Sequence, residues 1–158
     1  MLIEIKEVVD ANEKSAICND ILRALPDWFG IETSIVGYVE AVRAMPFYVV
    51  TDHGKAVGFV ALKVHNPFTL DVYVIGILKE YHRYGIGKML IECCEKYGRE
   101  QGMEYLTVKT LDASAKLKES EGYEKTRMFY QAVGFKPLEV FPLLWAEGVP
   151  CLMMVKNI

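Results

Sequence analysis

The residues best suited to chemistry lie in a glycine-bearing loop that leads from a strand into a helix. Residues 73–88 read YVIGILKEYHRYGIGK. The first N–H groups of a helix have no partner inside the helix, and the helix dipole leaves this end partly positive. Gly85 and Gly87 carry no side chain that would keep a phosphate away from the backbone. Donors or positive charge come from His82, Arg83 and Lys88. The loop is therefore predicted to bind a phosphate or diphosphate.

Two common phosphate-binding motifs do not match this loop. A Walker A motif needs glycine at the position of His82 and Ser or Thr at the position of Met89. A dinucleotide fingerprint needs a third glycine at the position of Leu90. On these residues alone, a tight strand-to-helix turn without any ligand explains the pattern as well as a phosphate site does.

Two segments together resemble the GNAT superfamily of N-acetyltransferases. Residues 74–90, VIGILKEYHRYGIGKML, resemble its acetyl-CoA signature, which is a strand, then Arg/Gln-x-x-Gly-x-Gly/Ala, then an amphipathic helix. Residues 127–135, RMFYQAVGF, resemble its Phe-Tyr-x-x-x-Gly-Phe element. The segments follow one another in the family's order, and the order of elements fits over almost the whole chain. One departure is His82, which stands where the family has Arg or Gln.

The resemblance implies where acetyl-CoA would bind. The diphosphate would lie on N–H groups of the loop, formed by His82, Arg83, Tyr84, Gly85, Ile86, Gly87 and Lys88. The pantetheine arm would run beside the preceding strand and bond to the backbone near Ile75 and Ile77, in the manner of an added strand. A bulge near Gly76 would splay two central strands. No metal is implied.

The resemblance also suggests residues for proton transfer. Asp71 matches a strand position where several relatives carry a catalytic Glu, and it would take the amine's proton through a water. Tyr130 matches a tyrosine near the thioester sulfur and would act as the acid. The alternative for Asp71 is an Asp at a strand start that is solvated or binds a loop N–H. The alternative for Tyr130 is a core aromatic beside Phe129 with its hydroxyl hydrogen-bonded.

Glu32, Tyr38 and Tyr73 would face the acceptor side and are alternative groups for the role of base. Trp28 and Phe29 would line the acceptor pocket, although they fit a core plug equally well.

The pattern of the whole chain predicts the elements that position these residues. Strands are expected over residues 2–9, 47–51, 56–64, 70–78, 104–110, 135–141 and 151–155. Helices are expected after Asp10, over 34–44 with Ile35, Val36, Val39 and Val42 inward, over 85–101 and over 124–133. In the helix over 85–101 the predicted buried stripe is Ile86, Met89, Leu90, Cys93, Cys94 and Tyr97, with Glu95 on the opposite face. This order predicts an α/β (α+β) fold. Its sheet would be mixed and mostly antiparallel, with a splayed strand pair and helices on both faces.

Length and composition limit the class of protein. The chain has 158 residues, a hydrophobic fraction of 52% and a net charge of −3, which predict one globular domain over residues 1–158 and disfavour a nucleic-acid partner. No apolar run reaches the length of a transmembrane helix, and the start does not resemble a signal peptide. The four cysteines are therefore expected as reduced thiols in a cytoplasmic protein. Cys93 and Cys94, on the predicted apolar stripe, are expected to pack in the core rather than react.

The predicted function is an N-acetyltransferase that moves an acetyl group from acetyl-CoA to a primary amine by direct transfer in a ternary complex. The amine is unidentified, and a homodimer is compatible with the resemblance. An alternative is a non-catalytic module with the same fold that binds acyl-CoA as a sensor or interaction partner. A more distant alternative is a nucleotide-binding regulatory domain.

Overall fold

The computed structural model describes residues 1–116 and 120–158, which form two compact units. The first unit consists of Met1–Lys63 and Val72–Tyr97, and the second of Val64–Asp71 and Gly98–Ile158. The strands are β1 Ile3–Glu7, β2 Phe47–Asp52, β3 Lys55–Asn66, β4 Thr69–Ile77, β5 Tyr105–Leu111, β6 Lys136–Ala146 and β7 Val149–Asn157. The helices are α1 Ala11–Arg23, α2 Glu32–Ala41, α3 Ile86–Glu100 and α4 Ser120–Ala132, with 3-10 turns η1 Val42–Ala44 and η2 Lys79–Tyr81.

Within the described residues, seven strands form a sheet in the order β1-β2-β3-β4-β5-β7-β6. The pairs β1–β2, β2–β3, β5–β7 and β6–β7 are antiparallel. The predicted α/β class with a mostly antiparallel sheet is thereby confirmed, as is the predicted order of elements. The splayed strand pair and the single domain over residues 1–158 remain predictions.

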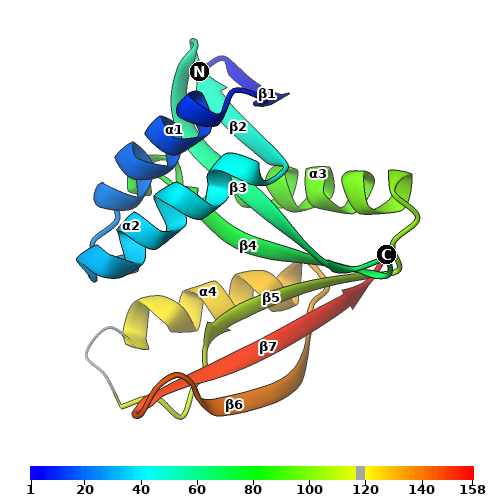
Figure 1. Ribbon diagram of the computed structural model, residues 1–158. Helices are drawn as coiled ribbons and strands as arrows, with labels where there is room; N and C mark the ends of the chain where they lie inside the picture. The colour runs from blue at the N-terminus through cyan, green and yellow to red at the C-terminus, as the bar shows by residue number, and fades with distance from the viewer. Residues whose placement is uncertain (117–119) are drawn as a thin grey trace. The chain divides into compact units, whose positions relative to one another are not determined.

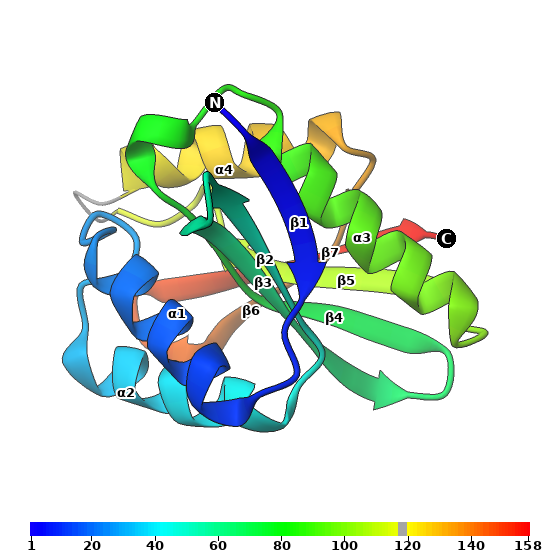
Figure 2. The same cartoon turned by 90° about the horizontal axis from the view of Figure 1, so that it is seen from above.

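In the first unit, helices cover both faces of the strands. Phe59 and Ala61 of β3 lie in one core with Cys18 and Leu22 of α1 and Ile35 of α2. Side chains alternate between faces along a strand, so the intervening residue Gly58 faces the other side, where a Cβ would lie 3.6 Å from Ile86 Cγ2 of α3. Figure 2 shows the same arrangement, with α1 and α2 on one side of β2 and β3 and α3 on the other.

A local signal explains where α1 begins. The Asp10 carboxylate accepts a 2.8 Å hydrogen bond from the Glu13 N–H and so caps α1, as the sequence predicts. In α2 the predicted inward face was wrong at Val36, which is 55% exposed, whereas Ile35 is buried as predicted. In α3 the buried stripe includes Ile91 and Glu95, neither of which was predicted there.

In the second unit, β5, β7 and β6 lie side by side and α4 packs against β5 (Figure 1). Three elements are longer than predicted. The helix α4 begins at Ser120 rather than near residue 124, and β6 continues to Ala146 rather than ending near residue 141. The last strand, β7, spans Val149–Asn157 rather than residues 151–155. The end of α4 is held by Lys156, whose ammonium donates to the Val133 carbonyl at 2.5 Å.

Among the described residues, no helix has both the length and the apolar character needed to cross a bilayer.

Candidate active site

The loop between η2 and α3 has a backbone conformation that a regular helix start would not give. Arg83 and Gly85 both have positive φ, at 69° and 78°. This region is open to glycine but costs most other residues free energy. The first N–H of α3 that bonds to a carbonyl at its start is that of Met89, which donates to Gly85 O at 3.1 Å. The preceding amides are therefore those a helix start leaves for an outside acceptor.

The side chains of this loop divide into buried and exposed groups. Ile86 is 1% exposed and anchors the helix start in the core, so it can offer only its backbone N–H. Arg83, Tyr84 and Lys88 are exposed. A Cβ at Gly85 would meet nothing within 4 Å, so the space above the backbone there is open. These features fit a diphosphate held by amides and flanked by two cationic side chains.

His82 points back at the strand. Its Nε2 donates to the Ile77 carbonyl at 2.8 Å, which fixes the proton on Nε2 because a carbonyl only accepts. Its ring also meets the Trp28 ring edge-on, with centroids 5.7 Å apart. The family's Arg or Gln is thus replaced by a residue whose ring ties the loop to β4 and to the segment after α1.

A second pair of residues joins the same two segments. Lys79 Nζ lies 3.8 Å from the Asp27 carboxylate, with both side chains about two-thirds exposed. Such an exposed pair contributes little stability on its own. Together with Trp28 and His82 it nevertheless shows that the segment after α1 lies against the segment that leads into the loop.

The turn η2 is anchored to the β2–β3 hairpin. Tyr81 OH donates to Asp52 Oδ2 at 2.7 Å, and the Leu2 N–H donates to Asp52 Oδ1 at 2.9 Å. These hydrogen bonds, that from Tyr81 first, hold the pKa of the Asp52 carboxyl at about 2. Sequence reasoning missed this anchor, because the two residues are 29 positions apart and neither belongs to a recognisable motif.

The strand β4 is irregular where the pantetheine arm was predicted. Tyr73 packs on Tyr38 of α2, with ring centroids 5.5 Å apart. A Cβ at Gly76 would lie 3.1 Å from Ile21 Cγ2 of α1, on the same side. Residues three apart in a regular strand face opposite sides, so the alternation is broken between them, as a β-bulge does. This agrees with the predicted bulge. Ile75 and Ile77 are half-buried.

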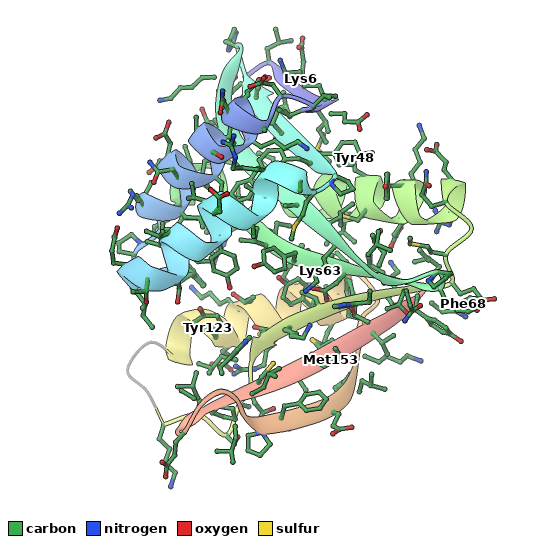
Figure 3. All side chains as sticks on the ribbon, in the orientation of Figure 1. Lys6, Tyr48, Lys63, Phe68, Tyr123 and Met153 are labelled. Atoms are coloured by element: carbon green, nitrogen blue, oxygen red, sulfur yellow. The ribbon has the colours of Figure 1, made fainter. Side chains whose placement is uncertain are left out.

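The predicted acceptor-side residues of the first unit form an aromatic series. Phe29 meets Tyr38 edge-on at 6.0 Å, and Tyr38 meets Tyr73. Lys63, labelled in Figure 3, brings its Nζ within 6.0 Å of the Tyr73 ring centroid. Trp28 and Phe29 are half-buried against the core, as the core-plug alternative predicts, and their role on the acceptor side stays a prediction.

Glu32, which was predicted on the acceptor side, forms an ion pair with Arg23. Its two carboxylate oxygens accept hydrogen bonds of 2.7 and 2.8 Å from the Arg23 guanidinium. This bidentate pair lowers the pKa of the Glu32 carboxyl below its usual range. A substrate amine would have to compete with Arg23 for this carboxylate.

In the second unit, Asp71 is a buried carboxylate surrounded by polar groups. It is 3% exposed, and its Oδ1 accepts a 2.7 Å hydrogen bond from Thr107 Oγ1. His65 Nε2 lies 3.7 Å and Lys109 Nζ 3.8 Å from the same oxygen. The alternative of a solvated Asp is therefore wrong. Sequence analysis did not assign Thr107, His65 or Lys109 to the site, because their proximity to Asp71 arises only when the strands pair.

Tyr130 is also buried. It is 5% exposed and packs against Phe129 and Phe135, with ring centroids 5.3 and 5.7 Å away. The Tyr130 carbonyl accepts from the Phe135 N–H at 2.9 Å, which ties the end of α4 to the start of β6. This packing fixes the ring and leaves the hydroxyl as its only group able to transfer a proton.

Three of the four cysteines lie in the core, and Cys93 is half-buried. Cys18, Cys94 and Cys151 are buried, all four cysteines are free thiols, and burial raises the pKa of each. For Cys18 the value is about 12. Thiols in this state are poor nucleophiles, which agrees with the predicted packing role. Among the described residues, no three His, Cys, Asp or Glu side chains are grouped as metal ligands would be.

Comparison with known proteins supports one family. The family model described as an acetyltransferase (GNAT) domain matches residues 43–137. An uncharacterized N-acetyltransferase of Chlorobaculum tepidum is 23% identical over 124 residues, which cover 77% of this chain and 70% of that protein.

Two solved structures show the same fold. A Desulfovibrio desulfuricans protein assigned to the GNAT family has a TM-score of 0.82 at 15% identity, covering 99% of both chains. The PaiA N-acetyltransferase of Thermoplasma acidophilum, solved with coenzyme A, has a TM-score of 0.74 at 17% identity, covering 100% of both chains. The region matched by the family model, residues 43–137, contains β4, the loop between η2 and α3, Asp71 and Tyr130. This chain belongs to the GNAT family of acetyltransferase domains.

Proposed function

We propose that this protein is an N-acetyltransferase that moves an acetyl group from acetyl-CoA to a primary amine by direct transfer in a ternary complex. The observation that carries the proposal is the loop before α3. Arg83 and Gly85 hold a left-handed backbone there, and exposed Arg83 and Lys88 flank the unbonded amides of the helix start. Structural relatives solved with coenzyme A support the choice of ligand.

Different residues are proposed to bind the coenzyme and to accept the proton of the amine. The amides of the loop, with Arg83 and Lys88, would hold the diphosphate, and acetyl-CoA supplies an activated acetyl thioester when bound. An alkyl amine titrates near ~10, so it must lose a proton before it can attack. Asp71 is the proposed final acceptor of that proton. Because Asp71 is 3% exposed, the proton would reach it through a water or through the neighbouring His65.

Tyr130 is the proposed acid. Its hydroxyl would deliver a proton to the thiolate of coenzyme A as that thiolate leaves. Aromatic residues Trp28, Phe29 and Tyr73 are proposed to line the acceptor side. The four free thiols support a reducing, cytoplasmic location, which is also part of the proposal.

One observation favours a second candidate, a module that binds acyl-CoA without turnover. Asp71 and Tyr130 are both nearly inaccessible, and Asp71 already has a hydrogen-bond donor in Thr107. If both residues are purely structural, the protein would still bind acyl-CoA but would transfer no acetyl group to an amine.

The decisive experiment combines binding and turnover. Calorimetry and thermal shift with coenzyme A test the loop, because a ligand that binds only the folded state raises the unfolding temperature. Thiol release from acetyl-CoA is then measured against a panel of polyamines, aminoglycosides, amino acids and peptide amines. Binding with amine-dependent release supports the enzyme, and binding without release from any amine supports the module. Absence of binding contradicts both.

A matched pair of variants tests Asp71. Asp71→Asn keeps an oxygen that can accept from Thr107, whereas Asp71→Ala leaves that hydroxyl unpartnered. If Asp71 accepts the proton, both variants lose turnover while Asp71→Asn keeps its stability. If Asp71 is structural, only Asp71→Ala shows a defect.

A further inference from the structure

His65 stands beside the buried carboxylate of Asp71 in the second unit. Its Nε2 lies 3.7 Å from Asp71 Oδ1, and its side chain is 27% exposed, against 4% for that of Asp71. A carboxylate only accepts, so in the neutral ring the nitrogen that faces Asp71 carries the proton and Nδ1 keeps a lone pair. His65 thus connects a carboxylate that solvent hardly reaches with the surface of this unit.

A tight turn and one neighbouring strand hold this pair in place. The Asn66 side-chain oxygen accepts a 2.8 Å hydrogen bond from the Phe68 N–H, which closes the turn between β3 and β4. The carbonyl of Phe68, a residue labelled in Figure 3, accepts from the Glu104 N–H at 2.9 Å and so joins the turn to the start of β5. The backbone around His65 and Asp71 is therefore fixed by hydrogen bonds on both sides of the turn.

Three described side chains lie near Asp71 Oδ1, and they differ in what they can do with a proton. Thr107 is 4% exposed and already donates its hydroxyl proton to this oxygen at 2.7 Å. The Lys109 ammonium, 3.8 Å from the same oxygen, has three donors and no lone pair. Neutral His65 has a lone pair and a partly exposed ring, so of these three it is the one that can take a proton from an amine.

We propose that His65 takes the proton of the acceptor amine and relays it to Asp71. This inference rests on the proposed function, because it assigns one step of the same acetyl transfer. The amine N–H bond breaks and an Nδ1–H bond forms, so the amine gains the lone pair that attacks the thioester. The proton on Nε2 then passes to Asp71 Oδ1, which leaves the ring neutral. For this second transfer the two atoms have to approach from 3.7 Å to hydrogen-bond length.

The charged groups that face His65 from the neighbouring strands have opposite signs. They are Asp71 of β4 and Lys109 of β5. Glu139 of β6 follows further across the sheet, in the same row of paired residues as Lys109. Lys63 stands two residues before His65 on β3 itself. A change of charge at Lys109 is therefore the most direct way to alter the field at the ring without touching the proposed relay.

The pH dependence of kcat in the thiol-release assay tests the relay. The wild type is expected to gain rate between pH ~5 and ~8, as an imidazole loses its proton. His65→Gln should lower kcat at least ~tenfold and abolish this rise, while affinity for coenzyme A and the unfolding temperature keep their wild-type values. His53→Gln is the matched control and should change neither, because His53 also lies beside a carboxylate, with Nδ1 2.9 Å from Asp52 Oδ1, and is 70% exposed.

Two further variants separate a relay from a structural role. His65→Ala should regain part of its turnover when imidazole is added to the buffer. Lys109→Met should move the rise in kcat to higher pH, because a cation near the ring is removed.

The outcomes distinguish this inference from the proposed function. Full turnover of His65→Gln with an unchanged pH profile would overturn the relay and leave the proposed function standing. Loss of stability or of coenzyme affinity in His65→Gln, without rescue of His65→Ala by imidazole, would show a structural role and also overturn the relay. A wild type that binds coenzyme A but releases no thiol with any amine would overturn both.

Discussion

The loop of the first unit differs from Asp71 and Tyr130 of the second unit in the groups that it offers for chemistry. The loop uses its backbone, whereas Asp71 and Tyr130 use their side chains. The loop offers backbone amides, and its side chains other than Ile86 are largely exposed. Asp71 and Tyr130 offer side-chain atoms that are 3% and 5% exposed. The loop should therefore tolerate side-chain changes but not backbone changes. The second unit should be sensitive to the loss of a single oxygen atom.

The largest effect is expected at Tyr130. Tyr130→Phe keeps the packing against Phe129 and Phe135 and removes only the hydroxyl. Turnover in the thiol-release assay should fall by ~100-fold, as for loss of a general acid, and affinity for coenzyme A should change by less than ~threefold. Tyr105→Phe, an exposed tyrosine of the same unit, is the control. Unchanged turnover would show that Tyr130 is not the acid. It would also contradict the expected sensitivity of the second unit to the loss of a single oxygen atom.

A smaller effect is expected at Gly85. Gly85→Ala adds a methyl group into open space, so its cost comes from the positive φ rather than from a clash. Affinity for coenzyme A, measured by calorimetry, should fall by ~tenfold because the amides are re-aimed. Gly37→Ala is the matched control, because its Cβ also meets nothing but its helical position favours Ala. Equal affinities for both variants would mean that the loop does not bind through its backbone.

The contact between Trp28 and His82 should show as a coupling of about threefold. If this contact supports the loop, the effects of Trp28→Ala and His82→Ala on coenzyme A affinity are less than multiplicative, because either change removes the same contact. The unfolding temperature without ligand should show the same coupling. Trp145→Ala with His82→Ala is the control cycle and should be multiplicative. A multiplicative Trp28–His82 cycle would show that the loop is held by its backbone alone.

The smallest effect is expected at Asp52 and depends on pH. Its pKa is about 2 in the folded protein, against an ordinary value of 3.8, so the ionised form stabilises the fold. This contribution is complete above the ordinary value and is lost as the pH falls towards 2. The difference in unfolding temperature between wild type and Asp52→Asn should therefore be constant near neutral pH and shrink below about pH 4. A difference that grows on acidification would contradict the Tyr81 anchor.

Sequence analysis succeeded where a signal is local. The Asp10 cap, the order of elements and the glycine-bearing turn before α3 each depend on neighbouring residues. The family resemblance added Tyr130 and Asp71, for which no local signal exists. The roles of these two residues remain predictions.

Sequence analysis failed where tertiary contacts decide. The pattern of α3 did not predict that Glu95 is buried, because the rotation of a helix on its axis depends on the sheet beneath it. The bond from Thr107 to Asp71 joins residues 36 positions apart and arises from strand pairing. The extension of β6 beyond Phe141 was missed because Pro142 signals the end of a strand, whereas an edge strand tolerates it.

The closeness of Gly76 to α1 sets the spacing between that helix and the sheet. Any side chain at this position would act as a wedge, since Ile21, Leu22 and Phe59 already lie 3.1–3.4 Å from where its first carbon would stand. The helix would have to lift by a few tenths of an ångström, and its far end leads directly to Trp28 and Phe29. Exchanging volume at residue 76 is therefore a way to reshape the acceptor side proposed at Trp28 and Phe29 without changing either of these residues.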